Sequence, residues 1–324
     1  MCTAISFRSR RHLFGRTFDL EHSYNESVVI TPRGYDFCFR ESPMPDMHYA
    51  LIGIAHTENG YPLYYDAVNE KGLCAAALNF PENAYYRPYR EGAVNLASYE
   101  LLPWLLRHCS DLAQAHTALQ SINLTQTAFS ADLPCTPLHW MLADKTGALV
   151  IEPMKDGLCI HENHVGVLTN APPFEHQLSN LCSYLGLSRK SPANSFGASA
   201  GLQPISRGTG AFGLPGDSSS PSRFVRSAFL LHNSPADLSP EEEISHFFHI
   251  MDSTAQVRGS VELENGAFVS TLYTACCDAQ KGIYYYTTYE NRQLHAVHLH
   301  HAPLDQESIT VFPLQQTQQI FFQN

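Results

Sequence analysis

The first nineteen residues, MCTAISFRSRRHLFGRTFD (residues 1–19), decide the fold expected for this chain of 324 residues. Cysteine is small enough for methionine aminopeptidase to remove Met1, and its removal would leave Cys2 with a free α-amine. One residue would then carry both a nucleophilic thiol and a base, because an α-amine with a reference pKa of ~7.7–8 can accept the proton of a thiol near ~8.5. A cysteine at position 2 also occurs by chance, so the residues that follow it must support this hypothesis.

Later in the same stretch, Phe14–Asp19 provides a fixed positive charge and a carboxylate shortly after the strand predicted at Thr3–Phe7. Arg16 would stabilise a thiolate, and Asp19 would hold the α-amine through a charge-assisted hydrogen bond. The alternative is an ordinary ion pair on the surface at the end of a strand.

Two asparagines end predicted strands of small or apolar residues. Asn79 lies at the end of Gly72–Pro81, and Asn170 lies at the end of Val167–Pro172. Asparagines in such positions are commonly turn formers. A side-chain amide together with a backbone N–H is also what a tetrahedral oxyanion needs, and losing one such donor typically costs ~2.7–4 kcal/mol of transition-state stabilisation.

Five motifs in a fixed order give the chain a recognisable pattern. They are MCTA (1–4), GRTFD (15–19), LNFP (78–81), LTNAP (168–172) and SRFVR (222–226). Together they resemble the choloylglycine hydrolase family, which comprises bile salt hydrolases and penicillin V acylases within the N-terminal nucleophile hydrolases. The resemblance implies an α+β fold: a four-layer αββα sandwich of two antiparallel sheets between helical layers. It also implies one domain over residues 1–324 and, commonly, a homotetramer.

The resemblance assigns a role to six residues. Cys2 is the nucleophile and, through its α-amine, the base; Arg16 and Asp19 position and tune it. Asn79 and Asn170 supply the oxyanion hole, and Arg223 belongs to the supporting polar network. The implied reaction cleaves an amide through a thioester intermediate, with no metal and no organic cofactor.

The implied substrate is a conjugated bile salt, because relatives that resemble the acylases usually carry tyrosine where this chain has Asn79. The steroid pocket is expected to be apolar, with walls from Leu20, Tyr24, Ala67, Phe129 and Leu133. Arg207, in a loop that resembles a selectivity loop, favours the sulfonate of taurine conjugates over glycine conjugates; the alternative is a solvated arginine in a mobile loop. The competing functions are a penicillin V or other N-acyl amide acylase, and a sterol- or acyl-amide-binding protein in which Met1 is never removed.

Composition limits the other partners. The chain carries 20 Lys and Arg against 31 Asp and Glu, a net charge of −11, which argues against nucleic acid and anionic membrane as partners. No apolar run approaches a membrane span of ~18 residues, and the N-terminus does not match a secretory signal. The nine irregularly spaced cysteines indicate reduced thiols in the cytoplasm. The C-terminal histidines lack a carboxylate or cysteine at metal-ligand spacing, so no metal site is expected.

The remaining pattern predicts alternating groups of strands and helices, with a long loop between them. Strands are expected at 3–7, 27–31, 51–56, 73–80, 138–144, 148–152, 165–169, 267–275, 283–288 and 293–298. Helices are expected at 97–109, at 111–121 with Ser110 as the N-cap, at 223–231, and after a capping box at Ser239–Glu242. Residues 188–222 are rich in Gly, Ser and Pro and predict a functional or disordered loop.

Overall fold

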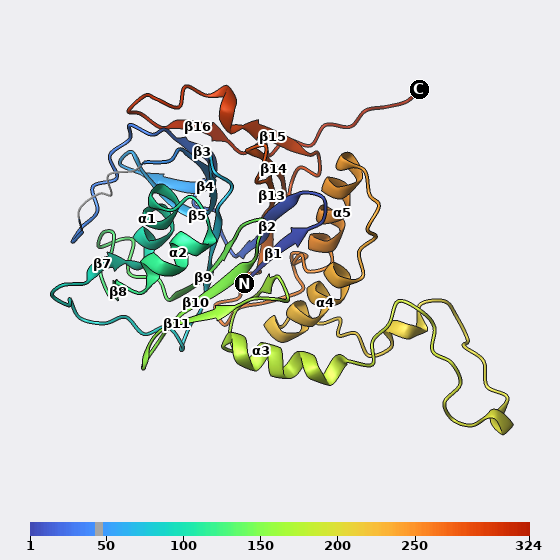
Figure 1. Cartoon of the computed structure of the whole chain (residues 1–324). Coiled ribbons are helices and arrows are strands. Elements are labelled where there is room, and N and C mark those ends of the chain that lie inside the picture. Colours follow the sequence, from blue (N-terminus) through green and yellow to red (C-terminus); the bar gives the residue numbers. More distant parts are fainter. Residues whose placement is uncertain (43–47) are drawn as a thin grey trace.

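Two large antiparallel sheets form the centre of the molecule (Figure 1). The computed structural model describes residues 1–42 and 48–324. The six-stranded sheet has the order β12 (Val167–Leu168), β1 (Cys2–Arg8), β2 (His12–Leu20), β13 (Ser270–Asp278), β14 (Ile283–Thr288) and β15 (His295–His298). The eight-stranded sheet has the order β11 (Gly157–Glu162), β10 (Ala148–Met154), β9 (Leu138–Ala143), β6 (Cys74–Asn79), β5 (Tyr61–Asn69), β4 (Leu51–Glu58), β3 (Ser27–Thr31) and β16 (Thr310–Pro313). A separate parallel pair joins β7 (Val94–Ala97) and β8 (Ile122–Thr125).

Helices cover the outer face of each sheet. On one side α4 (Ser220–His232) and α5 (Pro240–Asp252) contact β1, β2 and β13, with α3 (Phe174–Leu181) beside α4. On the other side α1 (Leu101–His108) contacts β5 and β6, with α2 (Leu112–Leu119) next to it (Figure 1). Short 3₁₀ turns occur at Ser98–Glu100, Cys182–Tyr184, Ala198–Ala200, Thr209–Ala211 and Leu299–His301. The predicted αββα layering is confirmed.

The central strands of the eight-stranded sheet are buried on both faces, and their sequences reflect this. Val28 and Ile30 of β3 belong to the core between the two sheets, whereas Val29 belongs to the core beneath α1 and α2. Successive side chains in a strand point to opposite faces, so a run of apolar residues supplies two cores at once.

Most of the predicted strands are present, but two central ones were not predicted. β2 carries buried polar residues (Arg16, Thr17 and Asp19), and β5 contains Pro62 and Asp66, so neither shows the apolar pattern of a central strand. Helix α3 was also missed. The two strands β2 and β5 place buried polar groups in the middle of the fold.

The helix boundaries follow local capping chemistry, with one correction. Ser239 and Glu242 form the predicted capping box at the start of α5. The predicted cap of α2 was wrong: Asp111, not Ser110, accepts the Gln114 N–H at 2.9 Å, while the Ser110 hydroxyl donates to Asp111. A carboxylate is the stronger acceptor at this positive helix end.

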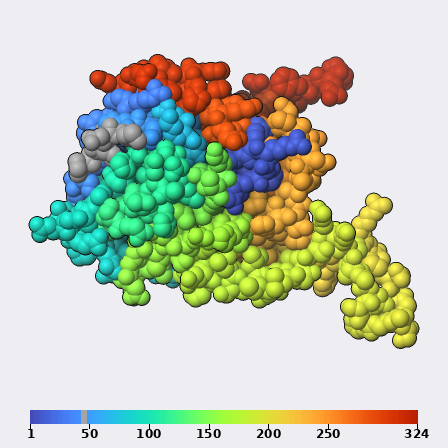
Figure 2. Space-filling view, viewed as in Figure 1, coloured from blue at the N-terminus to red at the C-terminus, as the bar shows by residue number. Residues whose placement is uncertain are grey.

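Residues 188–208 are all exposed and project from the body of the molecule (yellow in Figure 2). The hairpin predicted near the C-terminus is confirmed, because β14 and β15 pair antiparallel. Within the described ranges no helix is long and apolar enough to cross a membrane.

Candidate active site

Cys2 is the first residue of β1 and is 2% exposed. Met1 is attached to it, and the Met1 ammonium donates a hydrogen bond of 2.6 Å to the Asp19 carbonyl oxygen. The Cys2 backbone N–H donates to Asn170 Oδ1 at 2.8 Å. In this form the Cys2 nitrogen is a peptide amide, so it cannot act as a base.

Arg16 lies on β2, fully buried, with its guanidinium held by backbone carbonyls. Nη1 donates to the carbonyl oxygens of Tyr65, at 3.0 Å, and Ala77, and the guanidinium carbon lies 5.0 Å from the centre of the Phe18 ring. Burial acts to lower the pKa of Arg16, but its electrostatic interactions with the ionisable groups of Cys2, Tyr273, Asp66 and Asp19 together raise it. The side chain therefore provides a permanent positive charge beside the thiol.

Asp19 is fully buried at the other end of β2, close to the chain terminus. Its Oδ1 accepts the Thr271 hydroxyl at 2.7 Å, and its Oδ2 accepts the Thr17 hydroxyl at 3.2 Å. Burial raises the pKa of this carboxyl, and the opposing charges of the Met1 ammonium, Arg223 and Arg16 act to lower it. The carboxylate is thus placed where an N-terminal ammonium would stabilise it.

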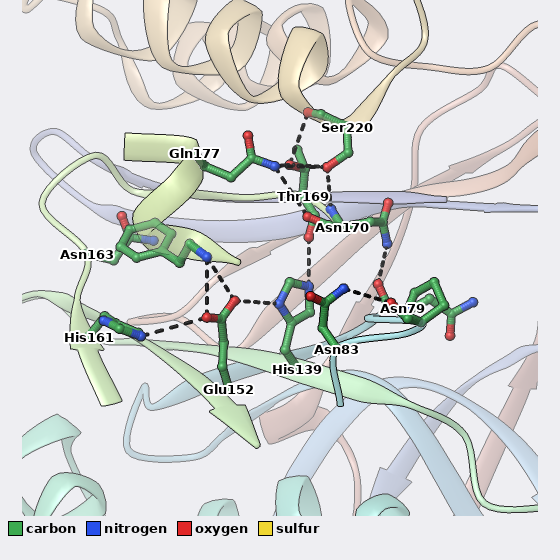
Figure 3. A network of polar contacts seen from close by, with 12 residues as sticks. Asn79, Asn83, His139, Glu152, His161, Asn163, Thr169, Asn170, Gln177 and Ser220 are labelled. Atoms are coloured by element: carbon green, nitrogen blue, oxygen red, sulfur yellow. Dashed lines mark hydrogen bonds and ion pairs between the residues drawn. The ribbon is translucent and has the colours of Figure 1, made fainter. Parts of the chain in front are cut away.

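Asn170 contacts both Cys2 at the chain terminus and Asn79 at the end of β6, and Figure 3 shows its contact with Asn79. Its Oδ1 accepts hydrogen bonds of 2.8 Å from both Cys2 N and Arg223 Nη2, and its Nδ2 donates to the Asn79 carbonyl at 2.8 Å. Arg223, which reaches the site from α4, also donates to the Cys2 carbonyl and, at 2.7 Å, to Thr3 Oγ1. Burial lowers the pKa of Arg223, while the charges of Asp19 and Cys2 oppose that shift.

A cavity of about 280 Å³ opens beside Cys2. Of the expected steroid-pocket walls, Leu20, Tyr24, Phe129 and Leu133 line it, as do Arg16 and Asn79. Several further lining residues were not predicted from the sequence, because they come from distant strands and loops: Phe18, His56, Leu63, Tyr65, Ser98, Tyr99, Asp132, Thr136, Leu138 and Trp140. The walls are therefore mainly apolar, with a few hydroxyl, imidazole and carboxylate groups.

The expectation that Ala67 is a wall is corrected. Ala67 is 3% exposed and packs in the core beneath α1 and α2. The cause is a β-bulge: Ile54 pairs with Asp66 and Ala55 with Tyr64, which leaves Tyr65 as an extra residue. A bulge shifts the alternation of side chains beyond it, so Tyr65 lines the cavity and Ala67 points away from it.

Arg207 lies away from the cavity of its own chain. It is exposed in the projecting segment 188–208, and in the described part of the chain the basic residues that line the cavity are Arg16 and His56. No group of three or more His, Cys, Asp or Glu suited to a metal ion occurs among residues 1–42 and 48–324.

Comparisons with known proteins agree with this geometry. The model of a family described as linear amide C–N hydrolases, choloylglycine hydrolase family, matches residues 2–312. A bile salt hydrolase/transferase of Lactiplantibacillus plantarum is 48% identical over 324 residues, covering 100% of both chains, and one of Clostridium perfringens is 36% identical, covering 98% of both.

Solved structures give the same result for the fold. The C2A mutant of the conjugated bile acid hydrolase from Clostridium perfringens superimposes with a TM-score of 0.91 at 35% identity, covering 100% of both chains. A penicillin V acylase from Agrobacterium tumefaciens has a TM-score of 0.74 at 18% identity, covering 96% of this chain and 91% of its own, and shares the fold.

Proposed function

Because this chain belongs to the choloylglycine hydrolase family and is a linear amide C–N hydrolase, we propose that it cleaves the amide bond of conjugated bile acids. The observation that carries the proposal is the position of Cys2, which lines a mainly apolar cavity together with Arg16 and Asn79. A rigid steroid fits walls such as Phe129 and Leu133, and the amide carbonyl would then lie beside the thiol.

The reaction we propose needs Met1 to be removed first. The Cys2 α-amine then accepts the thiol proton, and the thiolate, stabilised by Arg16, attacks the amide carbonyl carbon. The oxyanion accepts hydrogen bonds from the side-chain amides of Asn79 and Asn170; Asn170 has one N–H committed to the Asn79 carbonyl and a second N–H available.

Collapse of this intermediate breaks the C–N bond. The departing amine takes the proton from the Cys2 ammonium and leaves as taurine or glycine, so a thioester joins the acyl group to Cys2. Water then attacks the thioester while the same amine accepts the water proton. The carboxylic acid departs and the thiol is restored. Asp19 keeps the ammonium in place during both steps.

Substrate preference and assembly are part of the same proposal. The Asn79 side chain favours bile acids over penicillin V, and Arg207 favours taurine conjugates. Arg207 lies outside the cavity of its own chain. The taurine preference therefore requires Arg207 to contact a substrate that is not bound within that cavity alone. We expect one domain over residues 1–324 that acts in the cytoplasm as a homotetramer.

A competition assay tests the function. Taurocholate, glycocholate and penicillin V are mixed at equal concentration under reducing conditions, and the released acids are quantified by mass spectrometry. Cholate is the expected product, with taurine in excess of glycine; an Arg207→Ala variant should reduce that excess. Phenoxyacetate as the main product would favour the penicillin acylase alternative. If no product forms and the intact mass of the protein shows that Met1 is retained, that preparation is inactive.

A further inference from the structure

A buried histidine lies behind the two strand ends that carry Asn79 and Asn170. His139, on β9, is completely buried, and its ring stacks on that of Phe80, the residue after Asn79, with centroids 4.2 Å apart and planes 5° apart. Its Nε2 lies 2.8 Å from the carbonyl oxygen of Thr169, the residue before Asn170. One side chain therefore contacts both segments.

The second ring nitrogen meets a buried carboxylate. His139 Nδ1 lies 3.2 Å from Glu152 Oε1, and Glu152 is 1% exposed (Figure 3). The Phe174 backbone N–H donates to both carboxylate oxygens, at 3.0 and 3.3 Å. His161 Nε2 lies 3.7 Å from Oε2 and its Nδ1 lies 3.7 Å from Glu175, and Cys159 pairs with Glu152 across β10 and β11, so the pair has three titratable neighbours here.

These partners determine the protons on the ring. A carbonyl oxygen accepts only, and an ionised carboxylate accepts only, whereas a neutral imidazole has a single N–H to donate. Both hydrogen bonds form together when both ring nitrogens carry a proton. The Phe174 N–H, which donates to Glu152, favours a carboxylate that only accepts, so the hydrogen-bond geometry fits an imidazolium that donates to both acceptors.

The Thr169–Asn170 peptide group is held at both ends. Its carbonyl oxygen accepts from His139, and its N–H donates to Ser220 Oγ at 2.9 Å. On the same side Gln177 Nε2 donates to Ser220 Oγ at 3.1 Å. Fixing this peptide plane fixes the backbone from which the Asn170 side chain reaches Cys2 N and the Asn79 carbonyl.

We propose that His139, oriented by Glu152, is a positioning residue that holds the Thr169–Asn170 peptide and thereby aligns Asn170 with Cys2. The proposal rests on the proposed hydrolysis for its kinetic consequence. His139 does not line the cavity, so its effect on the reaction passes through Asn170. A displacement of about 1 Å at a reacting group can cost about 100-fold in rate.

Two matched substitutions isolate the contact to Thr169. In His139→Gln the amide nitrogen occupies the place of Nε2 and can still donate to Thr169. In His139→Asn the amide nitrogen occupies the place of Nδ1, so the donor to Thr169 is lost. Both variants lose the ring and its stacking on Phe80, so a purely structural role would affect them alike.

We expect His139→Asn to lower kcat by about 10- to 100-fold, with little change in KM for taurocholate. We expect His139→Gln to keep kcat within about fivefold of the unsubstituted protein, with both variants folded by circular dichroism. Equal losses of kcat in the two variants, or no loss in His139→Asn, would overturn the proposal.

Nitrogen-15 NMR spectra of protein with labelled histidine report the protonation of each ring nitrogen directly, and they need no substrate. The His139 signals, identified by their loss in His139→Asn, should report two protonated nitrogens. Glu152→Gln should convert them to one, because a glutamine amide can donate to an unprotonated Nδ1. A single protonated nitrogen in the unsubstituted protein would overturn the imidazolium assignment.

If the unsubstituted protein releases no bile acid, the proposed substrate fails while the positioning proposal remains testable. The rate at which iodoacetamide alkylates Cys2 in the Met1-processed protein then replaces kcat. We expect this rate to change in His139→Asn and to be retained in His139→Gln; identical rates in all three proteins would overturn the positioning role.

Discussion

Asn170→Ala is the substitution that tests the candidate site most directly. It removes three hydrogen bonds of 2.8 Å: those that Asn170 accepts from Cys2 N and Arg223 Nη2, and the one that it donates to the Asn79 carbonyl. Loss of one oxyanion donor typically costs about 2.7–4 kcal/mol, so kcat for taurocholate should fall about 100- to 1,000-fold.

The same change should also lower stability. Net losses of about 1 kcal/mol for each neutral hydrogen bond and about 2 kcal/mol for the bond to Arg223 lower the free energy of unfolding by about 4 kcal/mol. Urea unfolding measures this quantity, and ninhydrin detection of released taurine measures kcat. Activity is assayed at a temperature where circular dichroism shows the variant to be folded.

Asn163→Ala is the matched control. Asn163 is similarly buried, and its side chain accepts the Gly166 N–H at 2.8 Å and donates to the Val167 carbonyl at 2.9 Å, on the far end of the same segment. This variant should lose about 2 kcal/mol of stability and retain kcat. The reasoning would be refuted if kcat of Asn170→Ala stayed within a few-fold of that of the unsubstituted protein. It would also be refuted if kcat fell equally in Asn163→Ala.

Three further predictions follow from the site and the core. Cys2→Ser should lower hydrolysis by several orders of magnitude while calorimetry still detects bile salt binding; unchanged turnover would contradict the nucleophile assignment. Leu133→Ala should raise KM for taurocholate about 5- to 30-fold with kcat retained, because apolar wall area is lost; an unchanged KM would place the steroid elsewhere. Burial lowers the pKa of His12 from 6.5 to about 4. Between these pH values the unfolded chain therefore binds more protons than the folded one. As the pH falls from 6.5 to 4, the free energy of unfolding should decrease by about 3 kcal/mol. Urea unfolding at several pH values checks this, and His12→Gln should flatten that part of the profile.

Much of the fold could be predicted from local sequence, because strands and helix caps depend on short-range chemistry. The capping box at Ser239 and the strand at Ser27–Thr31 are cases of this kind. The strand that carries Arg16 and Asp19 could not be predicted, because buried polar residues interrupt its apolar pattern and most of their charge and hydrogen-bond partners, such as Arg223 and Thr271, lie far away in the chain.

Gly15 is another feature whose role could not be predicted from local sequence. The sequence shows a glycine next to Arg16, but not why it is there. In the structure a Cβ at Gly15 would lie 1.9 Å from the Ala275 carbonyl oxygen of β13. The close approach of two strands that are 260 residues apart in the sequence explains the residue.

The sequence by itself determined the family, the layered αββα class and the residues that bear the chemistry, because five short motifs keep their order and each carries its functional groups locally. The tertiary structure decided how those groups meet: Asn170 with Cys2 and Arg223, a bulge at Tyr65 that turns Ala67 out of the cavity, and His139 behind both asparagines. Such contacts join residues far apart in the sequence: Cys2 and Asn170 are 168 positions apart, and Asp19 and Thr271 are 252 positions apart. Register, bulges and buried hydrogen-bond partners are properties of the packed sheets, and no single segment contains them.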